Sequence, residues 1–464
     1  MLAFRHAAPS REALLSTTRR RWALTGMTGF TVVWVGQLVS MLGSGMTGFA
    51  ITIWAWQETG QATVLALVGL STFGPSVLLS PIAGALIDRF DRKHIMMLTD
   101  LGSSVPALIM LVLHSAGALE IWHLYVLGAW AGAFNAFQFP AYSAAISTML
   151  PKAQYARANG MLALAGSTAG IAAPILAGLL LAIVGIGGIF VIDLVTFGFA
   201  VLTLAIVVIP RPPPTTEVMA RVSLWRDALF GFGYIVKRRA LLHLQLVFTA
   251  VNLSATFGTI VLAPMVLART GNDEIALASV QSALGVGGVV GGLVISAWGG
   301  PKRRIHGVLI GMLGSGLLGM MLMGVGRDLP VWLVAAFFMI VFMPLLNGAT
   351  QSIWQAKVAP ALQGRVFAAR ATVGRITAPF AMIAAGPLAD HVFEPAMMPG
   401  GALAASLGAL VGTGPGAGMG LMMLLAGATT VVIALVAMTI PSIRTLEDTV
   451  PDHDAEVPTA SVPG

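Results

Sequence analysis

The chain has 464 residues, of which 57% are hydrophobic and only 10% are charged, and its mean hydropathy is +0.87. A soluble protein needs charged residues at roughly a quarter of its positions, so this composition excludes a soluble globular protein. The net charge of +7 would suggest nucleic acid in a soluble protein, but here its meaning depends on where the charges lie. The absence of cysteine excludes disulfides, thiolate metal sites and cysteine nucleophiles.

Apolar stretches long enough to cross a bilayer recur along the chain. One helical crossing needs about 20 mainly apolar residues, and about twelve such stretches can be marked. The predicted spans are 30–56, 62–87, 94–114, 121–149, 157–184, 187–209, 241–266, 275–299, 305–326, 330–356, 366–389 and 418–440. They predict an all-α membrane protein made of two six-helix bundles, 30–209 and 241–440.

Three segments lie outside the bundles: an N-terminal arm (1–29), a central segment (210–240) and a C-terminal tail (441–464). The central segment is basic, with apolar residues at helical spacing. It is predicted to form an amphipathic helix at the membrane surface, and a plain linker is the alternative. The acidic, proline-containing tail is predicted to be disordered.

The basic residues orient the spans. If the N-terminus is cytoplasmic, all 26 Lys and Arg residues except Arg269 and Arg327 fall on the cytoplasmic side. Cytoplasmic loops of membrane proteins carry such an excess of Lys and Arg. We therefore expect a multi-pass protein of a bacterial inner membrane, with both termini in the cytoplasm.

The two halves are related by an internal repeat. A constant shift of 212 residues superimposes identical residues without a gap across four spans, and both halves share one orientation. Parallel repeats of this kind characterise one large class of secondary transporters. The matches include Thr47 with Thr259, Arg92 with Arg304, His94 with His306, Gly102 with Gly314 and Asn135 with Asn347.

Polar side chains form matching stripes on spans 1, 4, 7 and 10. Because polar groups facing lipid would lose hydrogen bonds, these faces are predicted to line a central cavity, although simple helix-to-helix bonding is the alternative. Amides, hydroxyls and aromatic rings with almost no charge favour a large amphipathic ligand. The predicted cavity residues are Trp34, Gln37, Ser40, Ser44, Asn135, Gln138, Tyr142, Asn252, Thr256, Asn347, Gln351 and Trp354.

The loop after the second span carries a recognisable motif. It reads Gly-Ala-Leu-Ile-Asp-Arg-Phe-Asp-Arg-Lys and contains Gly84, Asp88, Arg89, Arg92 and Lys93. It resembles the signature between helices 2 and 3 of the major facilitator superfamily, Gly-x-x-x-Asp-Arg-x-Gly-Arg-Arg/Lys, with Asp91 in place of the second glycine. Further segments are similar to the macrolide-efflux and siderophore-exporter branch: Phe139–Ala141, Ala156–Gly160, Ile192–Phe197 and Gln363–Phe367.

This resemblance implies alternating access, proton antiport and outward transport of drugs or secondary metabolites. It also implies that Asp88 binds the start of span 11 near Gly364 and Arg365 and so closes an inner gate. A basic loop that only fixes topology is the alternative for this motif. Uptake of a nutrient, or lipid flipping by a member of the same superfamily, is the alternative function.

Two acidic residues fall inside predicted spans. A charged Asp at the middle of the membrane costs about 2.5–3.5 kcal/mol on insertion scales, so such residues usually have a function or a partner. Asp193 is the first candidate for the proton-carrying carboxyl, with a structural hydrogen bond as the alternative. Asp100 is a second candidate and is assigned to the gate network, with Arg157 or Arg365. Position suggests the roles of other charges: Arg370 and Arg375 are expected to pair with charges or to bind an anionic substrate group, and Glu58, Asp390 and Glu394 are expected to lie solvated at the outer rim.

The energy source follows from motifs that are missing from the sequence. There is no Gly-x-x-x-x-Gly-Lys-Ser/Thr loop, so the proton gradient rather than ATP is expected to drive transport. Neither a Gly-x-Ser-x-Gly nor a His-Glu-x-x-His motif supports an enzyme. We expect no cofactor, metal or nucleic acid; the expected partners are a small amphipathic substrate, protons and lipid, and the expected state is a monomer.

Overall fold

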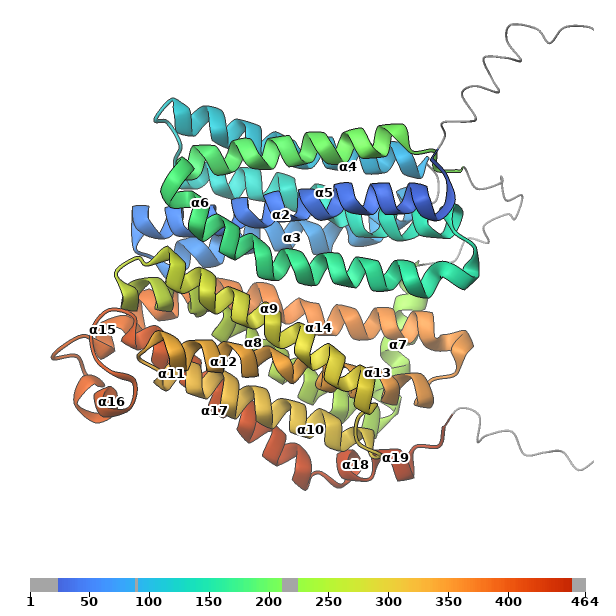
Figure 1. Cartoon of the computed structure of the whole chain (residues 1–464). Coiled ribbons are helices and arrows are strands. Elements are labelled where there is room, and N and C mark those ends of the chain that lie inside the picture. The colour runs from blue at the N-terminus through green and yellow to red at the C-terminus, as the bar shows by residue number, and fades with distance from the viewer. Residues whose placement is uncertain (1–23, 88–90, 211–223, 453–464) are drawn as a thin grey trace, which may run out of the picture.

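The computed structural model describes residues 24–87, 91–210 and 224–452, which are helical almost throughout (Figure 1). The N-terminal half contains α2 (Gly26–Thr59), α3 (Ala62–Ile87), α4 (Arg92–Ser115), α5 (Ile121–Met149), η1 (Lys152–Gln154) and α6 (Tyr155–Ile206). A linker helix, α7 (Leu224–Lys237), follows. The C-terminal half contains α8 (Arg239–Thr270), α9 (Glu274–Trp298), α10 (Arg304–Gly314), η2 (Ser315–Met321), α11 (Leu322–Val325), α12 (Leu329–Val341), α13 (Met343–Lys357), α14 (Pro360–Leu388), η3 (Ala389–Phe393), α15 (Glu394–Met397), α16 (Ala404–Val411), α17 (Ala417–Thr439), α18 (Pro441–Arg444) and α19 (Leu446–Thr449).

Helix α6 is two membrane spans joined at Gly185. This residue has φ 64° and ψ −179°, a conformation that only glycine adopts readily, and the chain reverses there (Figure 1). The end of the second arm returns to the start of α4, where Lys93 Nζ donates hydrogen bonds of 2.8 and 2.7 Å to the carbonyl oxygens of Ala205 and Val207. The predicted division between the fifth and sixth spans lies at this glycine.

Within the described residues, ten helical stretches are long and apolar enough to cross a membrane. One of them, Lys152–Ile206, contains both arms of α6, and the 29-residue helix α5 adds a further crossing. The described part of the chain therefore holds twelve crossings. This arrangement confirms the predicted all-α fold in two six-helix halves.

The repeat is visible in where the helices begin. Helices α3 and α9 start at Ala62 and Glu274, and helices α4 and α10 start at Arg92 and Arg304, so each pair is separated by the predicted shift of 212 residues. Figure 1 shows the two halves as two stacked groups of roughly parallel helices. The sequence matches thus reflect equivalent positions in the two halves.

The equivalent helices α4 and α10 are capped by acidic residues from different places in the chain. In α4 the side chain of Asp91 accepts a hydrogen bond from Lys93 N (2.9 Å) and caps the helix. The equivalent position before α10 is Arg303, which cannot cap. Instead Glu447, from the C-terminal tail, accepts hydrogen bonds from the backbone nitrogens of Arg304 and Ile305, each at 3.2 Å. A carboxylate at a helix N-terminus is favoured by the helix dipole.

The prediction of a disordered tail is wrong for residues 441–452. This segment forms α18 and α19, and Ile443 and Leu446 are buried against the C-terminal half. The buried ammonium group of Lys357 donates hydrogen bonds to the carbonyl oxygens of Glu447 and Val450. The acidic composition suggested a solvated chain, but two apolar residues three apart and a capping glutamate fix it in place. Residues 453–464 lie outside the described part.

The linker helix α7 packs against the protein. Figure 1 shows α7 running across the ends of the spans rather than along them. Tyr234 and Ile235 are buried in the same apolar cluster as Val366 of α14, and a Cβ on Gly231 would lie 2.4 Å from the carbonyl oxygen of Arg365. The apolar face of α7 is therefore covered by the C-terminal half.

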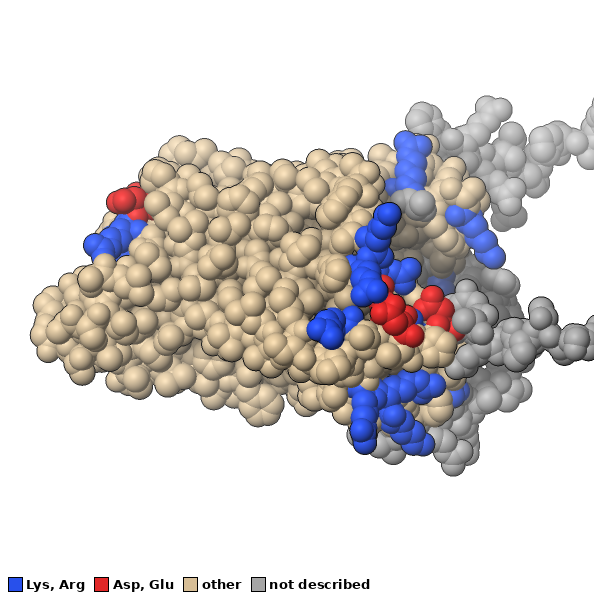
Figure 2. All heavy atoms as spheres, turned by 90° about the horizontal axis from the view of Figure 1, so that it is seen from below, with Lys and Arg blue, Asp and Glu red and all other residues tan. Residues whose placement is uncertain are grey.

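Basic side chains gather at one end of the molecule, in the view of Figure 2. We call this the basic end, and define it by Lys93, Arg303, Arg304, Lys357 and Arg444; the opposite end holds Gly60, Gly185 and Gly271. At the basic end the two halves have separate apolar clusters, one around Phe30 and Leu204 and one around Leu241 and Trp354.

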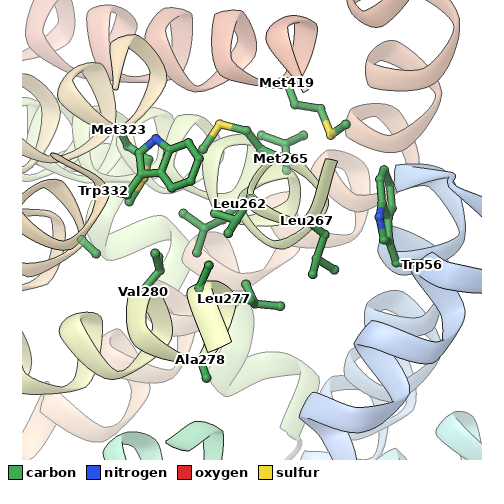
Figure 3. Packing of buried hydrophobic residues seen from close by; sticks show 14 of the residues in the cluster. Trp56, Leu262, Met265, Leu267, Leu277, Ala278, Val280, Met323, Trp332 and Met419 are labelled. Carbon is green, nitrogen blue, oxygen red and sulfur yellow. The ribbon is translucent and has the colours of Figure 1, made fainter. Parts of the chain in front are cut away.

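At the opposite end the two halves share one apolar core. Trp56 and Ile53 of α2 belong to the same buried cluster as Leu267 of α8, Leu277 of α9 and Met419 of α17. Figure 3 shows Trp56 on the N-terminal half beside the labelled residues of the C-terminal half. Because lipid tails are as apolar as these side chains, close packing rather than removal from water holds the two halves together here.

Hydrogen bonds between described residues of the two halves also lie toward the opposite end. Trp56 Nε1 donates to Asn272 Oδ1 (2.9 Å), and Ser282 Oγ donates to the carbonyl oxygen of Ile171 (3.1 Å). Asp390 caps α3 of the other half, accepting from Ala62 N at 2.9 Å and Thr63 N at 2.8 Å. The molecule is therefore closed at this end.

Asp390 and Glu394 were predicted to be solvated, and this prediction is wrong. Glu394 accepts hydrogen bonds from Gly416 N (3.1 Å) and Met419 N (3.0 Å), so it caps α17 as Asp390 caps α3. The Gly-rich segment 394–417 is held by Arg269, whose guanidinium donates to the carbonyl oxygens of Val411 and Gly416 in this segment and also to that of Gly326. Only Glu58 is exposed as predicted.

Removing the Asp390 cap should loosen the closure. Loss of an Asp N-cap costs about 1 kcal/mol, which changes an equilibrium ratio about fivefold. Because this cap joins the two halves, Asp390→Ala should increase the population that is open at this end. Since the chain lacks native cysteine, spin labels on cysteines introduced at exposed Ala118 and Asp328 would report the distance between the halves. Glu58→Ala, at the same end, is the control, and an unchanged distance distribution in Asp390→Ala would contradict the prediction.

Candidate functional site

A cavity of about 450 Å³ lies inside the N-terminal half, between α2, α3, α4, α5 and α6. Its wall is largely apolar, but several of the predicted polar residues face it. Ser40, Ser44, Asn135 and Gln138 line it, together with Asp193. The cavity therefore contains the first proton-coupling candidate among four residues of the predicted substrate site.

Asp193 is buried, with 2% of its surface exposed. Its Oδ1 accepts a hydrogen bond from Ser44 Oγ at 3.3 Å. The backbone of α2 approaches closely here, because a Cβ on Gly43 would lie 2.9 Å from Asp193 Oδ1 and 2.1 Å from Thr196 Oγ1. Glycine at this position thus lets α2 and α6 meet at the carboxylate.

Asp100 is also buried, with 1% exposed, and is held by two glutamines. Gln37 Nε2 donates to its Oδ2 at 2.8 Å, and Gln138 Nε2 donates to its Oδ1 at 3.2 Å. The two glutamines take the place that the sequence prediction gave to Arg157 or Arg365. Asp100 therefore lies in the interior of the N-terminal bundle, and its assignment to the gate network through Arg157 or Arg365 is corrected.

One face of α2 connects the two buried acids. Gln37 holds Asp100, Ser44 holds Asp193, and Ser40 lies between them, so the spacing of three and four residues puts all three on one side of the helix. Seven residues of helix span about 10 Å. The predicted polar stripe on span 1 therefore extends from the carboxylate of Asp100 to that of Asp193.

A second cavity, of about 440 Å³, lies in the C-terminal half between α8, α13 and α14. The predicted residues Asn252 and Gln351 line it, with Phe248 and Phe367. Two arginines from α14, Arg370 and Arg375, complete the wall. The sequence predicted one central cavity with almost no charge; in the structure these polar residues line separate pockets of the two halves, and the pocket that contains Asn252 and Gln351 is basic.

The other predicted cavity residues have different partners. Trp34 Nε1 donates to the carbonyl oxygen of Met161 (2.7 Å), and Tyr142 is buried and stacked on Phe30. Thr256 Oγ1 bonds the Asn252 carbonyl of its own helix at 2.8 Å. Of these side chains, Trp34 shows the helix-to-helix bonding that was the alternative. Trp354 is fully buried and Asn347 is exposed.

The motif after the second span is described only in part, since Asp88 and Arg89 lie outside the described residues. Gly84 is in α3, and Lys93 bonds carbonyls at the end of α6 rather than the other half. Arg92 is described, and two of its guanidinium nitrogens, Nε and Nη1, are buried with no hydrogen-bond partner.

On the other half, Gly364 is exposed and Arg365 lies over the ring of Phe230 in α7, 5.7 Å from its centre. The start of α14 therefore contacts the linker helix. The pairing of this region with Asp88 stays a prediction.

The fold and the paired cavities define a class of protein: a helical membrane transporter built from two parallel six-span repeats. The family model of the Major Facilitator Superfamily matches residues 33–382. The chain belongs to this superfamily, and it is a multi-pass membrane transporter rather than an enzyme.

Relatives with established names are distant but extend over most of the chain. Macrolide efflux protein A of Streptococcus pyogenes is 25% identical over 376 residues, which cover 78% of this chain and 90% of that protein. The multidrug efflux pump Tap of Mycobacterium tuberculosis is 27% identical over 371 residues, which cover 76% and 85%. These similarities confirm the predicted branch of the superfamily.

Solved structures share the fold. A bacterial homologue of the human lysosomal transporter Spinster, inward-facing and unoccupied, superimposes with a TM-score of 0.60 at 17% identity, covering 90% of this chain and 98% of that one. A bacterial homologue of the iron transporter ferroportin, also inward-facing, gives 0.60 at 16% identity, covering 88% and 98%.

Proposed function

We propose that this protein is a proton-coupled exporter of amphipathic small molecules that works by alternating access. The observation that carries the proposal is Asp193, a buried carboxyl that faces a cavity and accepts a hydrogen bond from Ser44. Among the described residues, no Lys or Arg forms an ion pair with Asp193 or Asp100. A carboxyl without a countercharge in a membrane bundle is costly when ionised, so proton binding is favourable there.

Two buried carboxyls, Asp193 and Asp100, are bonded to the same polar face of α2, which suits a proton pathway. In the proposed cycle Asp193 takes up a proton when the bundle opens outward and releases it when the bundle opens inward. Asp100, held by Gln37 and Gln138, is the second acceptor. A proton crossing 100 mV supplies about 2.3 kcal/mol, before any pH gradient is counted.

The substrate class follows from the cavity walls and the relatives. Both cavities combine apolar surface with side-chain amides, the N-terminal cavity adds hydroxyls, and each exceeds 400 Å³. Pockets of this kind bind drug-sized ligands, with a few polar groups fixing their orientation. The relatives named for macrolide and multidrug efflux support outward transport of such compounds.

The basic end is proposed to face the cytoplasm, in line with the distribution of Lys and Arg. The closed end would then face outward, and the structure corresponds to a state that accepts substrate from the cytoplasm. Both termini would be cytoplasmic in a bacterial inner membrane. The protein is proposed to act as a monomer without a cofactor.

Accumulation assays in bacterial cells test this proposal. Cells expressing the protein should accumulate less of a transported dye or macrolide than cells with an empty vector, and a protonophore should remove the difference. A panel of dyes, macrolides and siderophores covers the substrate class. Higher accumulation in expressing cells would instead show uptake, and a difference that survives the protonophore would exclude proton coupling.

A further inference from the structure

Arg370 occupies an unusual position for a charged side chain. It lies ten residues into α14, about 15 Å from the start of the helix, and is half-buried. The predicted span starts at residue 366, so Arg370 lies four residues, about 6 Å, inside it. Arginines at such depth face a cavity and usually mark a substrate or ion pathway.

The partners of Arg370 are neutral. Its Nη1 donates to Gln351 Oε1 at 2.7 Å, and its guanidinium carbon lies 5.5 Å from the ring centres of both Phe248 and Trp354. These contacts hold the guanidinium in place between α8 and α13. Among the described residues, no carboxylate lies within ion-pair distance of Arg370 or Arg375.

The positive charge is turned toward a space that can hold a ligand. Arg370 and Arg375 both line the 440 Å³ cavity, and Arg375 is exposed. A guanidinium has five N–H donors in a planar fork that matches carboxylate, sulfonate and phosphate groups. Phe248 and Phe367 supply an apolar wall beside the two arginines.

We propose that this cavity binds amphipathic organic anions. The acidic group of the ligand is held by Arg370 and Arg375, and its apolar part lies against Phe248 and Phe367. The described lining of the N-terminal cavity contains no Lys or Arg that could hold an anion, which separates substrate binding from proton binding. The binding of this ligand is inferred from the cavity alone. Its role as the exported substrate rests on the proposed function.

A matched pair of probes tests the inference by direct binding. Pyrenebutyrate is anionic and 1-pyrenebutanol is its neutral counterpart, and energy transfer from tryptophan reports binding to the purified full-length protein in phosphatidylcholine nanodiscs. Empty nanodiscs give the lipid background. The wild type should bind pyrenebutyrate at least tenfold more tightly than the alcohol.

Variants assign the preference to the arginines. Arg370→Gln and Arg375→Gln should each weaken pyrenebutyrate at least tenfold and leave the alcohol unchanged, and Arg370→Lys should retain part of the preference. Arg444→Gln, which removes the same charge from an exposed position of α18, is the control. Equal affinities for the two probes in the wild type, or an anion affinity that survives both Gln variants, would overturn the inference. If Arg370→Gln fails to fold, the exposed Arg375 decides the question.

Two sources could supply the anion, and the lipid composition separates them. If added phosphatidylglycerol weakens pyrenebutyrate binding in the wild type but not in Arg370→Gln, an anionic lipid headgroup occupies the site. If affinity is unchanged, the site takes a free amphipathic anion. Anion binding without any export in cells would contradict the proposed function alone.

Discussion

Asp193→Asn is expected to reduce pH-driven transport in proteoliposomes to the level of protein-free liposomes. Asparagine keeps the size of the side chain and can still hydrogen-bond Ser44, but it cannot take up a proton. If Asp193 carries the proton, the variant has nothing to couple to the gradient. The loss should therefore be in driven transport and not in folding.

Substrate exchange distinguishes coupling from binding in this experiment. Exchange of labelled for unlabelled substrate requires no net proton movement, so Asp193→Asn should retain it. Glu58→Gln, which neutralises an exposed acid of the same half, should behave as wild type in both assays. If Asp193→Asn still pumps while Asp100→Asn does not, the proton site is Asp100. If neither variant loses pumping, proton coupling through this bundle is wrong.

Gly291→Ala is expected to destabilise the protein, whereas Gly292→Ala, one residue further, is expected to be neutral or stabilising. A Cβ on Gly291 would lie 2.2 Å from the carbonyl oxygen of Val341 in α12, and no atom lies within 4 Å of a Cβ on Gly292. Alanine gains about 1 kcal/mol over glycine in a helix, while overpacking costs about 1–3 kcal/mol.

The clash at Gly291 should dominate because the opposing atom belongs to the backbone and cannot rotate away. Gly287, one turn earlier, faces the carbonyl oxygen of Phe337 at 2.4 Å, so α9 and α12 are in contact along two turns. Thermal unfolding in one detergent, followed by tryptophan fluorescence, should give a lower midpoint for Gly291→Ala than for Gly292→Ala. Equal midpoints would contradict this account.

Several details of the site could not be predicted from the sequence. Asp100 is the acid of span 3, and its distance from the cytoplasmic end suggested the gate network. The structure turns it toward Gln37 and Gln138. Both glutamines were predicted cavity residues, yet nothing in a single sequence tells which neighbouring helix an acid will meet.

Position relative to the membrane was misleading for other acids. Asp390 and Glu394 fall near the end of a span, which suggested contact with water. Each instead caps the first turn of another helix, and Glu447 does the same from the tail. In each case the helix start that the carboxylate caps is distant in sequence, or belongs to the other half.

The sequence by itself determined the number of spans, the parallel repeat and the superfamily. These follow from the cost of placing polar groups in lipid and from identities at a constant shift, and both can be read residue by residue. Only the tertiary structure decided which groups meet: the acids with their glutamine and serine partners, the shared core at one end, and the division of the polar residues between an acidic and a basic cavity. Those contacts depend on how each helix is rotated about its axis and on which helices are neighbours. Both are determined by how the side chains pack in three dimensions.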